Sequence, residues 1–232
     1  MMKKLLAVCS MLLPLTSSAF TVDNMILVAN QDNNGVLTIT SNSKEPEYIK
    51  GFINKIDIVD GEIKKVKLTK DNLPLWDLAL IPNKVILNPG ERRRLSMKNL
   101  CKKNCEIGKD RMYQVVLLPT TKDEEEESSV GINFGYAPVF IIPTSNPEID
   151  YSFSFKNGKL HVNNKSNTML YVQIDNCTEN LTKNCSESYT VVSGRIKDFE
   201  VPAGVKKADS LKLRIASHDY SYNEVEYVKA SN

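Results

Sequence analysis

The stretch DRMYQVVLLPTTKDEEEESSVGINFGYAPVFIIP, residues 110–143, decides the fold of this chain. It contains two apolar runs, at 112–118 and 131–142, which are joined by an acidic loop. The second run starts by alternating large residues with small or polar ones, and successive side chains of a strand point to opposite faces. The large residues therefore share one face, which another surface must cover. They are Val130, Ile132, Phe134 and Tyr136.

The loop between these runs carries consecutive acidic residues at 123–127. Such a run could bind a cation or supply an acid–base pair. Consecutive like charges repel each other and bury nothing, which favours a solvated stretch instead. An acidic loop next to an apolar strand would also help to keep that strand soluble.

Short alternating runs bounded by turn residues recur along the whole chain and predict an all-β protein built from sandwiches. Asp60-Gly61 and Asn157-Gly158 each separate two such runs, and these dipeptides favour two-residue hairpin turns. A helical turn at 72–78 is the one exception that we expect. Strands are predicted at 22–29, 36–40, 48–59, 62–68, 76–80, 84–87, 93–97, 112–118 and 131–142, and then at 151–155, 159–163, 169–175, 188–192, 195–201, 211–217 and 224–228.

Pro143 and Pro147 enclose a polar break after the longest apolar strand, and a fresh series of strands follows. Because proline interrupts a regular strand, we expect a domain boundary here. The predicted organisation is a leader at 1–19, a first domain at 20–144 and a second domain at 145–232.

The leader predicts export. Lys3 and Lys4 precede an apolar stretch that is too short to span a bilayer, and small residues follow at 17–19, which is the layout of a cleaved signal peptide. A lipoprotein would need Cys9, which lies inside the apolar stretch. Cleavage after Ala19 removes two of the 30 basic residues and none of the 28 acidic ones, which leaves 28 of each. This balance argues against nucleic acid as a partner, and no later run is long enough for membrane insertion.

Four cysteines remain after cleavage, in the close pairs Cys101–Cys105 and Cys177–Cys185. In an oxidising compartment such pairs favour two disulfides. One zinc site with four thiolates is the alternative, although neither pair has CxxC spacing.

No pattern predicts catalysis, because the chain lacks a GxSxG elbow, a phosphate-binding glycine loop and an HExxH motif. His161 lies in one predicted strand and His218 directly follows another, and neither has an acid or cysteine at ligand spacing, so we expect no enzyme, no metal and no cofactor. Arg92 and Arg94 share one face of a predicted strand. This fits an ordinary surface strand, and also a pair of guanidinium groups that grips a carboxylate.

The order of these segments resembles the periplasmic chaperones of the chaperone–usher pathway, which assemble fimbriae. The resemblance covers almost the whole chain. Its second half looks most like the divergent branch that assembles common-pilus, alpha-type fimbriae. The segments that carry it are PNKVILNPGERRRLSM (82–97), DRMYQVVLLP (110–119), VGINFGYAPVFIIP (130–143), YSFSFKNGKLHVNN (151–164), SYTVVSG (188–194) and FEVPAG (199–204).

The resemblance implies two immunoglobulin-like domains set at an angle, in a periplasmic protein whose partners are pilus subunits and an outer-membrane usher. The last strand of the first domain would complete the fold of a subunit that lacks its own final strand. Mapped by position, the donor side chains are Val130, Ile132, Phe134 and Tyr136. A dimer that caps this strand in the free protein is a further partner that such a strand allows.

Two points of this mapping stay open. Counting back from Pro143 without a bulge puts Gly131 and Asn133 on the donor face, whereas a one-residue bulge puts Ile132 and Phe134 there. Family members also hold the subunit's terminal carboxylate with a basic pair, but no basic residue occurs at 20–43 or 123–155. Either Arg92 or Arg94 replaces that pair, or capture depends on strand addition alone. An exported structural or adhesive immunoglobulin-like protein is the alternative function.

Overall fold

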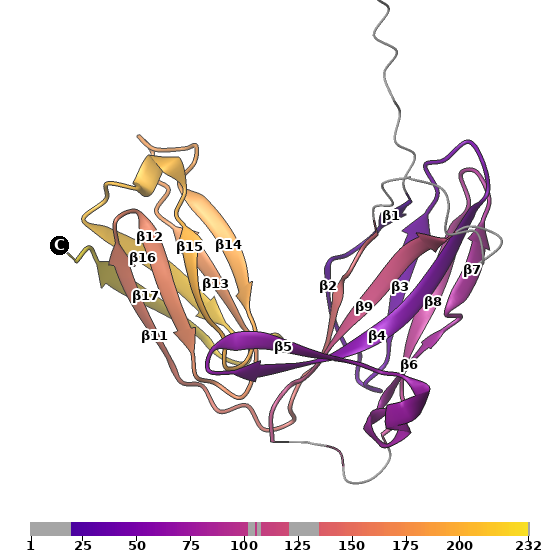
Figure 1. Ribbon diagram of the computed structural model, residues 1–232. Coiled ribbons are helices and arrows are strands. Elements are labelled where there is room, and N and C mark those ends of the chain that lie inside the picture. Colours follow the sequence, from indigo (N-terminus) through magenta and orange to yellow (C-terminus); the bar gives the residue numbers. More distant parts are fainter. Residues whose placement is uncertain (1–19, 102–104, 106–107, 121–134, 232) are drawn as a thin grey trace, which may run out of the picture.

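The computed structural model describes residues 20–101, residue 105, residues 108–120 and residues 135–231, and it folds into two β-sandwiches (Figure 1). The leader, the acidic run at 123–127 and three of the expected donor residues lie outside the described residues. These three are Val130, Ile132 and Phe134.

The first sandwich packs a four-stranded sheet against a six-stranded sheet. The four-stranded sheet has the order β1 (Thr21–Val22), β3 (Gly35–Thr40), β8 (Arg92–Asn99) and β6 (Leu78–Ile81). The six-stranded sheet has the order β2 (Ile26–Val28), β10 (Val139–Ile142), β9 (Arg111–Thr120), β4 (Glu47–Val59) and β5 (Glu62–Lys67), and β7 (Lys84–Leu87) also pairs with β4.

Inward-facing residues of both sheets form one apolar core. Leu37 and Ile39 from β3 meet Val115 and Leu117 from β9, because alternate residues of each strand point inward. Phe20, directly before β1, is fully buried in the same core. The 3-10 helix η1 (Lys70–Leu75) confirms the expected helical turn, a few residues before its predicted position.

The second sandwich packs β11 (Tyr151–Lys156), β12 (Lys159–Asn164) and β15 (Ile196–Glu200) against a second sheet. That sheet has the order β14 (Ser186–Val191), β13 (Leu170–Asp175), β16 (Ser210–Ala216) and β17 (Asn223–Lys229), and the short 3-10 helix η2 is Ala203–Val205. Its separate core includes Leu160, Val172, Leu213 and Ile215. The all-β prediction is therefore confirmed, and the strands of the two sandwiches lie on either side of the break at 143–147.

One predicted strand is wrong in an informative way. Residues 22–29 form two short strands that belong to different sheets. β1 pairs antiparallel with β3, and β2 pairs parallel with β10. The chain crosses between the sheets at 23–25, where the amide of Asp23 donates to Thr38 and the carbonyl of Met25 accepts from Val139. A single run of alternating residues does not reveal such a crossing.

The long β4–β5 hairpin extends from the first sandwich across to the second (Figure 1). Its turn is Asp60-Gly61 with φ of 54° and 77°, and Asn157-Gly158 in the second sandwich has φ of 53° and 70°. Both hairpin predictions are confirmed. Glycine suits these turns because it adopts positive φ at little cost. No helix in the described part of the chain is long and apolar enough to cross a membrane.

Candidate functional site

The backbone leading into β10 runs along the edge of β9. The amide of Leu117 donates to the carbonyl of Tyr136 at 2.8 Å, and the amide of Tyr136 donates back at 3.0 Å. Val115 donates to Pro138 at 2.8 Å. The antiparallel pairing of β9 with β10 therefore continues to Tyr136, well before the start of β10 itself.

On its other side, this extended segment has no partner among the residues that the structure describes. β2 pairs with β10 only from Val139 onward, and the amide of Val139 makes the last bond of this side, to Met25. A strand paired on one side only presents backbone groups that can extend a sheet into another chain. Residues 135–138 are therefore an open edge.

Gly135 fits this close approach because it has no side chain. A Cβ atom at this position would lie 2.5 Å from the carbonyl oxygen of Leu117 and 2.5 Å from a methyl carbon of Leu118. The first of these atoms is backbone and cannot move aside cheaply. The small residue of the alternating pattern therefore has a packing reason of its own.

Tyr136 points toward the core of its own sandwich. Its ring packs edge-on against Phe20, with 5.2 Å between ring centroids, and it is partly buried against the first core. Phe140 and Ile142 of β10 also face this core, as residues of equal parity in a regular strand do. A ring held in this way is not exposed for another protein, so the structure does not give Tyr136 the outward position expected of a donor side chain.

Arg92 and Arg94 lie elsewhere. They stand opposite Thr40 and Thr38 of β3. Leu95 and Met97 of the same strand are buried, so Arg92 and Arg94, at the alternate positions, lie on the exposed face of the four-stranded sheet. Tyr136 pairs with the other sheet. The structure therefore does not bring the two arginines beside the open edge.

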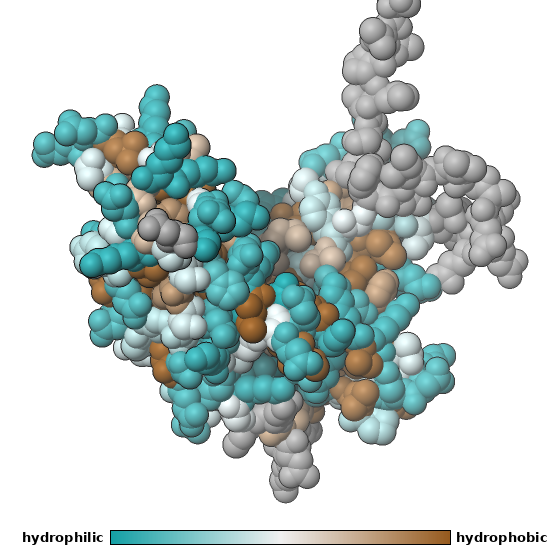
Figure 2. Space-filling model, turned by 60° about the vertical axis from the view of Figure 1, so that its left-hand side comes forward, coloured by the Kyte–Doolittle hydropathy of each residue, from teal (hydrophilic) through white to brown (hydrophobic). Residues whose placement is uncertain are grey.

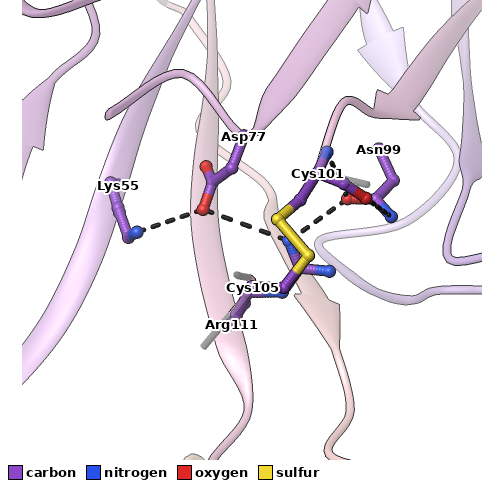
Figure 3. Close-up of a disulfide and its surroundings, with 6 residues drawn as sticks. All are labelled: Lys55, Asp77, Asn99, Cys101, Cys105 and Arg111. Atoms are coloured by element: carbon purple, nitrogen blue, oxygen red, sulfur yellow. Dashed lines mark hydrogen bonds and ion pairs between the residues drawn. A yellow bond between two sulfur atoms is a disulfide. The ribbon is translucent and has the colours of Figure 1, made fainter. Parts of the chain in front are cut away.

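Both cysteine pairs form disulfides, Cys101–Cys105 and Cys177–Cys185. Each lies in a different sandwich, so the four sulfur atoms do not gather at one zinc site. The surroundings of the first disulfide are shown in Figure 3. The amide of Cys101 donates to Oδ1 of Asn99 at 3.3 Å, and a guanidinium nitrogen of Arg111 donates to the same oxygen at 3.2 Å.

Asp77 faces this group from the other side (Figure 3). Its Oδ2 atom accepts from Lys55 Nζ at 3.1 Å and lies 4.0 Å from Arg111. Tyr113 is buried next to Asp77 and Arg111, and burial raises the pKa of its phenol far above the ordinary value of 10.0. The group ties the disulfide to β8 and β9. It contains no nucleophile beside a base, so its chemistry is structural.

The sequence did not reveal that His161 has an acidic partner. His161 Nδ1 lies 2.6 Å from Asp198 Oδ1 across the β12–β15 pair, an acid 37 residues away that no local spacing could reveal. Both side chains are about half exposed, at 47% and 57%. His218 instead lines a cavity of about 390 Å³ at the junction of the sandwiches.

Asp110 is a buried charged group at that junction, with 2% of its surface exposed. Its Oδ1 atom accepts from the amide of Thr144 at 3.0 Å, and its Oδ2 atom accepts from the amide of Met169 at 2.7 Å. Burial raises the pKa of this carboxyl above its ordinary value. Asp110 thus holds both the connecting segment and the second sandwich.

The surface seen in Figure 2 is mostly hydrophilic, and hydrophobic residues form only small separate areas on this face. The open edge can pair its backbone with another chain at 135–138, and the bonds of Asp110 hold the two sandwiches together at the junction.

Comparison with known proteins follows the same division of the chain. Residues 22–143 match the family model described as the CS5 fimbrial protein N-terminal domain. A relative from Escherichia coli, described as an uncharacterized 25.9 kDa protein in the CS5 3′ region, is 29% identical over 171 residues, which make up 72% of this chain and 74% of the relative.

The similar solved structures span both sandwiches. The class 5 fimbriae chaperone CfaA has a TM-score of 0.54 and 19% identity, over 90% of this chain and 99% of that chain. A chain of the CsuC–CsuE chaperone-tip adhesion subunit complex from Acinetobacter baumannii has a TM-score of 0.53 and 11% identity, over 92% of this chain and 100% of that chain. The fold is therefore that of the chaperone–usher periplasmic chaperones, with two immunoglobulin-like domains. Because the family model covers more than half of the 232 residues, the chain belongs to the CS5 fimbrial protein family.

Proposed function

We propose that this protein is a periplasmic chaperone that captures fimbrial subunits by donor-strand complementation and delivers them to an outer-membrane usher. The observation that carries the proposal is the open edge at 135–138, which continues the β9–β10 ladder and has no second partner among the described residues. The fold shared with fimbrial chaperones over nine tenths of the chain supports it. The predicted leader supports a periplasmic location, and the proposed function contains no catalytic step.

The donor side chains would be Ile132 and Phe134, with Val130 at the start of the strand. In an unbulged strand these residues would face the same way as Tyr136, which packs on Phe20. Presenting them to a subunit therefore requires a one-residue bulge between 134 and 136, or a different register in the complex. Residues before Tyr136 would then contact the subunit, whereas Tyr136 and the residues after it pack on the core of the chaperone's own first domain.

A few buried side chains are enough for capture. Burying one large apolar side chain contributes roughly 1.5–3 kcal/mol, and backbone pairing adds geometric specificity. The cost of ordering the donor segment subtracts from this sum, so the complex is expected to be tight yet exchangeable at the usher. In the free protein, two copies would cap the same edge as a dimer.

The terminal carboxylate of the subunit is a separate question. Arg92 and Arg94 could hold it only if that terminus ran over the exposed face of β8. Capture by strand addition alone makes no use of them. Replacing both with glutamate distinguishes the two: a several-fold loss of captured subunit supports the arginine anchor, and unchanged capture refutes it.

The proposal is tested by expressing the protein in the periplasm with a CS5-type fimbrial subunit and purifying it through an affinity tag. The subunit should be recovered with the parent protein and lost with the pair Ile132→Asp and Phe134→Asp. The matched control is the pair Val225→Asp and Tyr227→Asp, since both residues are exposed apolar positions of β17. Recovery of no subunit with the parent would refute the chaperone proposal and favour an exported structural or adhesive protein.

A further inference from the structure

The β4–β5 hairpin is longer than the sandwich needs. β4 pairs with β9 only as far as Ile56, opposite Met112, whereas its pairing with β5 continues to Val59. All six residues of β5 are exposed, and within the described part of the chain β5 pairs only with β4. Residues 57–62 therefore project beyond the first sandwich, toward the second one (Figure 1).

The tip of this hairpin binds the second sandwich through polar contacts. The carbonyl of Gly61 accepts from the amide of Ile196 at 3.2 Å and also from the guanidinium of Arg195. The same guanidinium pairs with Glu62 at 2.6 Å. The Arg195 side chain is 17% exposed and Glu62 is 68% exposed, so solvent screens this ion pair from the carboxylate side and the bonds to the carbonyl of Gly61 carry more of the contact.

Apolar packing accompanies these bonds. A Cβ atom on Gly61 would lie 2.7–2.9 Å from three carbon atoms of Ile196, so the absence of a side chain permits the contact. Ile58 also lies near Gly194, where a Cβ atom on the glycine would be 3.4 Å from the Cβ of Ile58, an ordinary packing distance. Toward the base of the hairpin, Ile56 belongs to a buried cluster that also contains Met169 of the second sandwich.

The base of the hairpin is also held on the first domain. Lys109, directly before Asp110, bonds Asp57 at 3.0 Å, and this bond lowers the pKa of the Asp57 carboxyl. The base of the hairpin is thus held by Lys109, just before β9, and its tip is held by Arg195 and Ile196, at the start of β15.

We infer that the β4–β5 hairpin is a brace that sets the angle between the two domains and so positions the open edge at 135–138 relative to the second domain. Without it, the contacts between the domains would include the connecting segment, the bonds of Asp110, the bond from Asn167 to the carbonyl of Gly108 and the small cluster around Met169. The step from domain angle to subunit capture depends on the proposed function. The claim that the hairpin sets the domain angle does not depend on the proposed function.

Two glycines provide a matched pair of variants. Gly61→Ala and Gly158→Ala each place a side chain at φ of about 70–77° in a two-residue hairpin turn, so they impose a similar local strain. Only Gly61 touches the other domain, whereas the nearest atoms to Gly158 belong to the flexible side chain of Lys206. Glu62→Gln is a milder second variant, which removes the ion pair and keeps the turn.

The measurement is the distribution of distances between spin labels on cysteines introduced at Lys98 and Lys207, which are exposed residues of the two domains. The parent and Gly158→Ala should give one narrow distribution, and Gly61→Ala should give a broad one, with Glu62→Gln in between. Equal widths for Gly61→Ala and Gly158→Ala would overturn the brace. This comparison needs no subunit and is valid even if the chaperone proposal fails.

Subunit capture is then measured with the same variants. If Gly61→Ala reduces the population of the competent angle to about a third, its apparent affinity for the subunit falls about threefold. Gly158→Ala should bind as the parent does. A broad distribution together with unchanged affinity would refute the link between brace and capture, and loss of binding by the parent itself would refute the proposed function instead.

Discussion

Replacing Asp110 with asparagine should weaken the junction between the domains by a predictable amount. The carboxylate accepts from two backbone amides, those of Thr144 and Met169, while almost fully buried. Asparagine offers one acceptor oxygen, so one of these N–H groups must face an NH₂ donor. A buried unsatisfied group costs about 1–3 kcal/mol, and relief of the buried charge offsets part of it. We expect a net loss of about 1–2 kcal/mol.

The assay is urea unfolding followed by fluorescence of Trp76, the single tryptophan, which lies in the first domain next to η1. Asp23→Asn is the control, because Asp23 is exposed and should change the stability by less than about 0.5 kcal/mol. Equal midpoints for Asp110→Asn and Asp23→Asn would refute the view that Asp110 holds the junction.

The pH dependence of this difference has a defined sign. Burial raises the pKa of Asp110 in the folded protein above its ordinary value of 3.8, and the hydrogen bonds from the amides of Thr144 and Met169 oppose this shift in part. The folded state therefore binds this proton more tightly than the unfolded state does. The stabilising effect of Asp110 relative to asparagine is fully present below pH 3.8 and falls as the pH rises through the raised pKa. A difference that grows with rising pH would contradict this assignment.

Two further changes test the packing of each domain. Tyr136→Ala removes the ring that packs on Phe20 and should cost about 1–3 kcal/mol in the first domain, seen as a lower urea midpoint of Trp76 fluorescence, whereas Tyr220→Ala, at an exposed position, should leave that midpoint unchanged. Replacing Cys177 and Cys185 with serine opens a loop of 8 residues and should cost about 2–3 kcal/mol. Circular dichroism of the second domain should show this loss, and Trp76 fluorescence should not.

Local rules explain what could be read from the sequence. The two hairpin turns were predictable because asparagine or aspartate followed by glycine tolerates the positive φ that such turns need. The two sandwiches followed from evenly spaced alternating runs with a break at Pro143 and Pro147. The disulfide pairs were predictable because their members are close in the chain.

Contacts between distant residues explain the rest. The inward direction of Tyr136 depends on Phe20, and the contact of the hairpin tip joins Gly61 to Arg195, which are 134 residues apart. The expected alternation put Tyr136 with the donor residues, since a period of two carries no information about which face meets which core. The outward face of Arg92 and Arg94 was predictable, but their distance from the open edge depends on which sheet β8 joins.

The central claim is that residues 130–134 pair with a fimbrial subunit as a donor strand. Photo-crosslinking tests this claim most directly. A benzophenone amino acid is placed singly at positions 131, 132, 133 and 134, and at Val225 of the second domain as a control, during co-expression with the subunit. The bulged register predicts covalent adducts with the subunit from 132 and 134, and none from Val225. Adducts from 131 and 133 alone would indicate the unbulged register. A chaperone–subunit complex that forms without any adduct from these four positions would contradict the claim.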